Sequence, residues 1–121
     1  MMKPYPLERI MAIERVAVIG AGTMGAGIAQ VCAQAGWTTA LYDAFPEGLE
    51  RGMQRIDAFW DKGIARGKTT PEQKEAWAKN LRAEADMKTA VHDVDLVIEA
   101  VPEIPELKAK VFAQLLSLIH I

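Results

Sequence analysis

The apolar residues of the chain form short runs that predict four strands. Residues 15–19 and 94–101 are near-continuous apolar runs, the form that a parallel sheet buries on both of its faces. Residues 38–43 predict a further strand, and residues 81–84 predict a short one. The segments between these runs have a different pattern, in which apolar positions recur at helical spacing.

That helical spacing predicts a helix or a helical turn between successive strands. The expected helical segments are residues 23–35, 46–66, 70–80, 86–91 and a helix that begins near 107. Gly36 is placed to end the first helix in a left-handed cap. Thr70 and Gln73 have the spacing of a capping box. Alternating strands and helices with right-handed crossovers predict an α/β fold with a doubly wound parallel sheet.

Composition narrows the class of protein. The chain has 121 residues, of which 50% are hydrophobic and 25% charged, and this balance is typical of one globular domain. Its net charge of −2 gives no electrostatic basis for binding nucleic acid or an anionic membrane. No run approaches the length of a membrane span. The single cysteine, Cys32, is expected to pack in the core and fits a reducing, cytoplasmic location.

A glycine-rich turn lies between the first predicted strand and helix. Gly20, Gly22 and Gly25 have the G-x-G-x-x-G spacing of a dinucleotide-binding turn. Gly20 permits the tight turn, Gly22 leaves room for a pyrophosphate, and Gly25 lets the helix lie close to the sheet. The anion is then expected at the helix N-terminus. The candidate cofactor-binding turn comprises Gly20, Ala21, Gly22, Thr23, Met24 and Gly25.

Asp43 ends the predicted strand 38–43, about twenty residues after the turn. A carboxylate there is expected to accept hydrogen bonds from the adenosine ribose hydroxyls. A 2′-phosphate would meet like charge, and the next residue is Ala44 and not an arginine, so the sequence favours NAD over NADP. The alternative is that Asp43 only starts the following turn.

Three segments of the sequence, taken together, resemble one protein family. They are residues 18–30, 41–43 and 95–103, and the last is followed by Leu107, Lys108, Val111 and Phe112. The combination resembles the NAD-binding domain of the 3-hydroxyacyl-CoA dehydrogenases over roughly residues 14–115. The resemblance implies a Rossmann-type sheet that is truncated before it is complete.

The resemblance also implies an activity and additional site residues. Members of the family oxidise the 3-hydroxyl of L-3-hydroxyacyl-CoA to 3-ketoacyl-CoA with NAD, in fatty acid β-oxidation or short-chain acid metabolism. Glu103 and Lys108 fall on positions that approach the cofactor, whereas the role of Glu99 stays open. Arg66 and Lys68 lie in the helical arm that meets the CoA tail. The alternatives are a carboxylate at a helix N-terminus for Glu103, a strand-end partner of a backbone amide for Glu99, and ordinary solvated positions for the three basic residues.

By the same resemblance, the catalytic histidine, its glutamate and a Ser/Asn pair fall beyond this chain, so no catalytic residue is expected here. The chain alone is expected to be inactive and to be part of a parent enzyme that forms a homodimer through a C-terminal domain. His92 is expected to be solvated. The expected segments are a loose leader at 1–13, the partial NAD-binding domain at 14–115, and a tail at 116–121. The tail departs from the family pattern and has a back-translation like a sequencing adapter, so we expect it to be non-native.

Two other classes of protein have a similar NAD-binding part, so two alternative functions stay open. One is a hydroxy-acid dehydrogenase of the carnitine or gulonate type, whose substrate residues would also lie downstream. The other is a module that senses NAD(H) without chemistry, and a basic DNA-reading segment that would support it is not visible. A histidine–glutamate pair followed by a helical domain, in the reading frame beyond residue 115, would distinguish the enzymes from the module.

Overall fold

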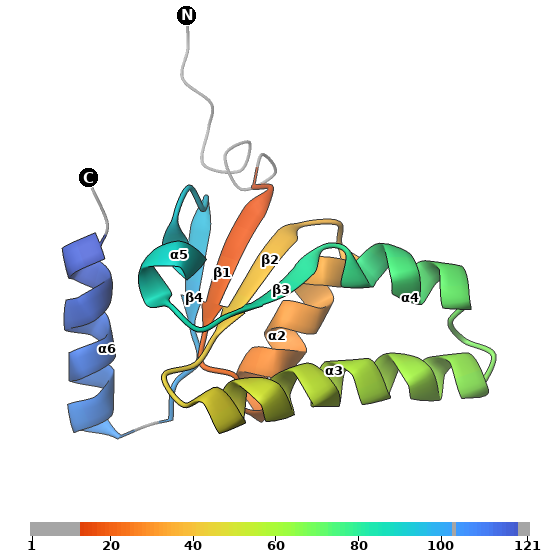
Figure 1. Ribbon diagram of the computed structural model, residues 1–121, viewed down its shortest axis with the longest axis horizontal. Helices are drawn as coiled ribbons and strands as arrows, with labels where there is room; N and C mark the ends of the chain where they lie inside the picture. Colours follow the sequence, from red (N-terminus) through yellow and green to blue (C-terminus); the bar gives the residue numbers. More distant parts are fainter. Residues whose placement is uncertain (1–12, 103, 119–121) are drawn as a thin grey trace, which may run out of the picture.

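The computed structural model describes residues 13–102 and 104–118, and shows a parallel sheet with helices on both faces (Figure 1). The alternation of strands and helices that the sequence predicts is confirmed. In chain order the elements are β1 (Arg15–Ile19), α2 (Thr23–Gln34), β2 (Thr38–Tyr42), α3 (Pro46–Ala65), α4 (Pro71–Ala78), β3 (Leu81–Glu84), α5 (Met87–Val91), β4 (Leu96–Glu99) and α6 (Pro105–Leu118).

The strand order is β3-β2-β1-β4, and all neighbouring strands are parallel. Arg15 of β1 lies opposite Thr38 of β2, and Val16 lies opposite Leu96 of β4. The order reverses beside β1, because β2 and β3 lie on one side of it and β4 on the other. Open α/β sheets bind ligands at such a reversal, beyond the carboxyl ends of the strands.

Both faces of the sheet are covered, which explains the near-continuous apolar run in β1. Val16 and Val18 pack in a core with α2 and α3, whereas Ala17 and Ile19 pack in a second core with α5 and α6. Alternate residues of a strand point to opposite faces, so every residue of the run after Arg15 is buried.

The strand β4 is shorter than the predicted run at 94–101. Its backbone pairing extends beyond the strand, since the Asp95 N–H donates to the Arg15 carbonyl at 2.8 Å and the Ala100 N–H to the Ile19 carbonyl at 2.7 Å. The Asp95 carboxylate also accepts from the N–H groups of Glu14 and Arg15, both at 3.0 Å. These bonds align the start of β4 with the start of β1 without extending the regular strand.

The helices α3 and α4 form a hairpin on the α2 side of the sheet (Figure 1). The predicted capping box of α4 is confirmed, because Thr70 accepts from the Gln73 N–H and the Gln73 side chain accepts from the Thr70 N–H. The rings of Trp60 and Trp77 join the two helices at 5.8 Å between centroids. Gly36 has the predicted positive φ, +91°, after α2.

The expected leader at 1–13 lies outside the described residues except for Ile13. The expected tail at 116–121 falls partly in α6, which continues through Leu118, and its last three residues are not described. Across the described parts of the chain, no helix combines the length and apolarity needed to cross a membrane.

Candidate functional site

The glycine-rich turn joins β1 to α2 where the strand order of the sheet reverses. Gly20 has φ +108°, and its N–H donates to the Tyr42 carbonyl at 2.8 Å. A Cβ at Gly20 would lie 2.6 Å from the Ala100 carbonyl oxygen of the chain leaving β4. Glycine is therefore required here both by backbone conformation and by the close approach of a neighbouring segment.

Gly22 and Gly25 have opposite surroundings. A Cβ at Gly25 would overlap the carbonyl oxygen of Gly20, whereas a Cβ at Gly22 would meet nothing within 4 Å. Gly25 is thus needed for packing of α2 against the turn. Gly22 is exposed, lines a pocket and is the N-cap of α2, so its missing side chain leaves open space at the helix N-terminus.

The amides at the start of α2 face that space. The first backbone bond of the helix runs from the Ala26 N–H to the Gly22 carbonyl at 2.8 Å. The N–H groups of Thr23, Met24 and Gly25 precede it, so they have no partner within the helix. Together with the helix dipole, such amides favour an anion.

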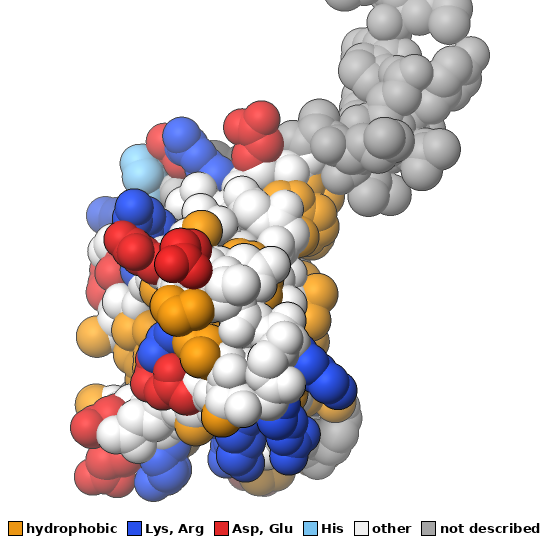
Figure 2. All heavy atoms as spheres, turned by 90° about the vertical axis from the view of Figure 1, so that its right-hand side faces the viewer, with side chains coloured by type: hydrophobic (Ala, Val, Ile, Leu, Met, Phe, Trp, Pro, Cys, Tyr) orange, Lys and Arg blue, Asp and Glu red, His pale blue; other side chains and the backbone are white. Residues whose placement is uncertain are grey.

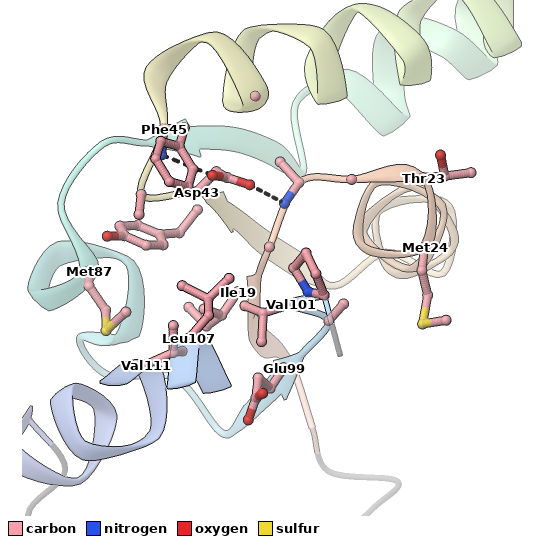
Figure 3. A pocket seen from close by; sticks show the side chains of 18 of the residues that line it. Ile19, Thr23, Met24, Asp43, Phe45, Met87, Glu99, Val101, Leu107 and Val111 are labelled. Carbon is pink, nitrogen blue, oxygen red and sulfur yellow. Dashed lines mark hydrogen bonds between the residues drawn. The ribbon is translucent and has the colours of Figure 1, made fainter. Parts of the chain in front are cut away.

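Asp43 follows β2 directly and its carboxylate bridges two segments (Figure 3). One oxygen accepts from the Ala21 N–H at 2.8 Å and the other from the Phe45 N–H at 2.9 Å. The bond to Phe45 is the one expected of a residue that starts a turn, whereas the bond to Ala21 ties the glycine turn to β2. A carboxylate has about four acceptor positions, so both oxygens can accept further hydrogen bonds.

The turn and Asp43 form one side of a pocket of about 770 Å³, within the size range of cofactor sites. The opposite side is apolar and lies between the carboxyl ends of the strands and the helices α5 and α6 (Figure 3). Its side chains are those of Ile19, Tyr42, Met87, Val101, Leu107 and Val111. Burial is the main cause that raises the pKa of the Tyr42 hydroxyl, and the nearby carboxylates of Asp43 and Asp86 raise it further. The hydroxyl therefore stays neutral near pH 7.

The end of β4 brings Glu99 and Lys108 to the same pocket. The Glu99 Oε1 atom is buried and has no hydrogen-bond partner among the described residues. It lies 3.8 Å from the Lys108 Nζ atom, close enough for an ion pair. Glu103, which the resemblance places near the cofactor, lies outside the described residues.

The other predicted residues lie away from the pocket. Arg66 and Lys68 are exposed beyond the end of α3 and do not line it. Cys32 is buried as expected, and burial raises the pKa of its thiol. His92 is exposed, with its Nε2 atom 3.4 Å from an oxygen of Asp93.

The sequence reasoning missed Arg51 and Arg55, which line the pocket from α3. Their i, i+4 spacing in the first half of a helix that follows Asp43 is the signal that was available. In the helical period of residues 46–66, Arg51 falls opposite the apolar positions, on a face that mixes acidic and basic residues. The fold shows that part of this face borders the pocket.

Comparisons with known proteins agree on one family. Residues 15–120 match the family model described as 3-hydroxyacyl-CoA dehydrogenase, NAD binding domain. The chain is 46% identical over 103 residues to the 3-hydroxyadipyl-CoA dehydrogenase of Escherichia coli K12, covering 85% of this chain and 22% of that protein. It is 34% identical over 105 residues to a probable 3-hydroxybutyryl-CoA dehydrogenase of Bacillus subtilis, covering 87% of this chain and 36% of that protein.

Solved structures give the same result. The crystal structure of FadB2 from Mycobacterium tuberculosis has a TM-score of 0.85 and 34% sequence identity, with 91% of this chain and 38% of that chain covered. A 3-hydroxybutyryl-CoA dehydrogenase from Escherichia coli K12 has a TM-score of 0.80 and 43% identity, with 88% and 22% covered. The chain thus spans between about a fifth and two fifths of the length of these relatives.

Proposed function

The chain belongs to the NAD-binding domain family of the 3-hydroxyacyl-CoA dehydrogenases, and we propose that it is the cofactor-binding part of an enzyme that oxidises L-3-hydroxyacyl-CoA to 3-ketoacyl-CoA. The parent reaction belongs to fatty acid β-oxidation or short-chain acid metabolism. The main support for the proposal is the open space at Gly22, the N-cap of α2. The preceding residue, Ala21, donates its N–H to the Asp43 carboxylate.

The residues present fit NAD. The amides of Thr23, Met24 and Gly25 bind the diphosphate, and the missing side chain at Gly22 lets it approach the backbone. The free acceptor positions of Asp43 bind the adenosine ribose hydroxyls while the same carboxylate holds the turn through Ala21. When bound, NAD supplies the hydride acceptor of the reaction.

Charged residues at the end of β4 complete the cofactor site. Lys108 lines the pocket, and Glu99 holds its ammonium there through their 3.8 Å ion pair. The family resemblance implies a role at the cofactor for Glu103 as well, which lies outside the described residues. Arg66 and Lys68 bind the phosphates of the acyl-CoA substrate outside the pocket. Their exposure and their separation from the glycine turn support a role with the substrate and not the cofactor.

Among the described residues, His92 does not meet the requirements for a general base. Removal of hydride from carbon requires a base at the substrate hydroxyl, and His92 is exposed, pairs with Asp93 and does not line the pocket. We therefore expect no oxidation of a 3-hydroxyacyl-CoA by the 121-residue chain alone, measured by NADH absorbance.

Direct titration with NADH and NADPH tests the proposal. We expect NADH to bind, and NADPH to bind about tenfold or more weakly because its 2′-phosphate meets the Asp43 carboxylate. Gly22→Ala is expected to weaken NADH binding by about tenfold, since its methyl group enters the phosphate space, and to leave the fold intact.

Gly27→Ala is the matched control, because a Cβ there also meets nothing within 4 Å but Gly27 does not line the pocket. It should leave NADH affinity unchanged. No binding of either nucleotide, or equal affinity for both, would contradict the proposed function.

A further inference from the structure

One side of α3 carries a row of basic residues. Arg51, Arg55 and Lys62 fall at helical spacings that place them on one side, and Arg66 continues the row at the C-cap. We call these four residues the basic face of α3, and all four are exposed. Figure 2 views the molecule from the side where α3 ends in Figure 1, and it shows basic side chains along the lower part of that side.

The charge of the basic face is not neutralised by the rest of the described chain. The acidic residues Asp57 and Asp61 lie on a different side of α3, and both pair with Lys74 of α4, at 2.8 and 2.7 Å. Among the described residues, no carboxylate lies within ion-pair distance of Arg51, Arg55, Lys62 or Arg66. Cations without partners on a structured helix attract an anionic ligand.

The first two residues of the basic face are fixed at the cofactor pocket. Arg51 and Arg55 line the same pocket as Gly22 and Asp43, whereas Lys62 and Arg66 do not. The helix is held there by Gly52, where a Cβ would lie 2.6 Å from the Ala21 carbonyl oxygen. This backbone contact sets the two arginines, one residue before it and three after it, beside the glycine turn.

We propose that Arg51 and Arg55 bind the diphosphate of the dinucleotide from α3, as a second wall of the site whose first wall is the N-terminus of α2. This inference rests on the proposed function and extends it to residues outside the glycine motif. A guanidinium group binds phosphate oxygens through two parallel hydrogen bonds, which backbone amides alone do not provide. The arginines neutralise the charge of the diphosphate on the side that faces solvent.

The position of the arginines favours the cofactor over the CoA substrate as the source of the phosphate. They share a pocket with the turn and with Asp43, the residues that recognise a dinucleotide. Arg66 and Lys68, beyond the end of α3, are left to bind CoA. The two groups of cations thus serve two different phosphate esters.

Calorimetric titration of Arg51→Gln, Arg55→Gln and the double variant with NADH, ADP, adenosine and CoA tests this assignment. We expect the double variant to lose about tenfold or more in affinity for NADH and ADP, because charge-assisted hydrogen bonds to phosphate are removed. Adenosine lacks the diphosphate, so its affinity should change less than twofold. The affinity for CoA should also stay unchanged.

Lys62→Gln is the matched control, since it removes one positive charge from the same side of α3 outside the pocket. It should leave ADP affinity unchanged. Replacing both arginines by lysine should restore part of the lost affinity, because the charge returns without the paired hydrogen bonds. Thermal unfolding checks that every variant remains folded.

The outcomes separate this inference from the proposed function. Loss of CoA affinity with unchanged ADP affinity would assign the arginines to the substrate and overturn the inference. So would unchanged ADP affinity in the double variant, or an equal loss for ADP and adenosine. If the unmodified chain binds neither NADH nor ADP, both the proposed function and the inference about the two arginines fail.

Discussion

At the scale of single residues, the three glycines of the turn differ in what a methyl group would meet. At Gly25 it would overlap the Gly20 carbonyl, at Gly20 it would press on the Ala100 carbonyl, and at Gly22 it would meet open space. The fold therefore requires glycine at two of these positions, whereas at Gly22 only the proposed ligand would require it. Stability and binding measurements on single alanine variants can separate these requirements.

We expect Gly25→Ala to lower the free energy of unfolding by about 3 kcal/mol or more, because neither backbone segment can move aside without separating α2 from the sheet. Gly27→Ala, two residues on in the same helix, should raise it by roughly 0.5–1 kcal/mol, since alanine is the better helix former and has free space there. Urea unfolding measures both values. Equal effects of the two substitutions would contradict the close contact at Gly25.

A second residue-scale prediction concerns pH. Backbone hydrogen bonds, first from the Glu14 N–H and then from the Arg15 N–H, lower the pKa of Asp95 below its ordinary value of 3.8. The folded state therefore favours the ionised carboxylate. This contribution to stability is complete above the ordinary pKa and is lost as pH falls through it toward the lowered value.

We expect Asp95→Asn to reduce the loss of stability between about pH 5 and pH 2, measured by urea unfolding across that range. Some pH dependence should remain, because hydrogen bonds from Thr89 also lower the pKa of Asp86. The effect of Asp95→Asn should exceed that of the control Glu50→Gln, which removes a carboxylate of α3 that accepts from the Gln54 side chain at 3.4 Å and from no backbone N–H of the described residues. An identical curve for Asp95→Asn would show that the bonds to Glu14 and Arg15 do not stabilise the fold.

At the scale of elements, the hairpin of α3 and α4 is held by a few specific contacts. The helix α4 has no buried residue, so its own burial contributes little to its position. The Trp60–Trp77 contact, the ion pairs of Lys74 with Asp57 and Asp61, and the capping box hold it instead. The Trp60 Nε1–H also donates to the Gln34 side chain of α2 at 3.0 Å, which connects the hairpin to the main core.

The capping box gives a prediction at this scale. Thr70→Ala removes the acceptor of the Gln73 N–H, so we expect the free energy of unfolding to fall by about 1 kcal/mol. Faster amide exchange confined to α4 should accompany the loss. Thr70→Ser keeps the hydroxyl and should retain most of the stability. An unchanged exchange rate in α4 after Thr70→Ala would contradict the role of the cap.

At the scale of the whole molecule, the sheet is protected unevenly. The β1 residues from Val16 to Ile19 are at most 1% exposed, whereas each residue of β4 is partly exposed. The strand β4 lies at one edge of the sheet, and β3 lies at the other. The apolar side chains of Phe112 and Leu116 on α6 are exposed as well.

We therefore expect native-state amide exchange to be slowest in β1 and β2 and faster in β4, because local opening needs little free energy where few groups are buried. Mass spectrometry after exchange at neutral pH measures the protection of each strand. Adding NADH should slow exchange in the glycine turn more than in β3, which does not line the pocket. Uniform protection across the four strands would contradict this view of the sheet.

The strands, the helices and the position of the glycine-rich turn could be predicted from the sequence alone. Buried runs, helical spacing and caps are local patterns, so they predicted the strands, the helices and even the left-handed Gly36. The G-x-G-x-x-G spacing is equally local, because the close contact between Gly25 and the Gly20 carbonyl joins residues of the same short segment. The length of β4 was predicted less well, since its ends are set by partners in β1 about eighty residues away.

How the candidate site is completed depends on contacts that no local pattern in the sequence specifies. The bond between Asp43 and the Ala21 N–H, the burial of one Glu99 oxygen and the position of Arg51 and Arg55 at the pocket all depend on segments distant in the chain. A helical period predicts that Arg51 and Arg55 share a side, but not what that side faces. The contact of Gly52 with Ala21 decides it, because it brings α3 against the turn.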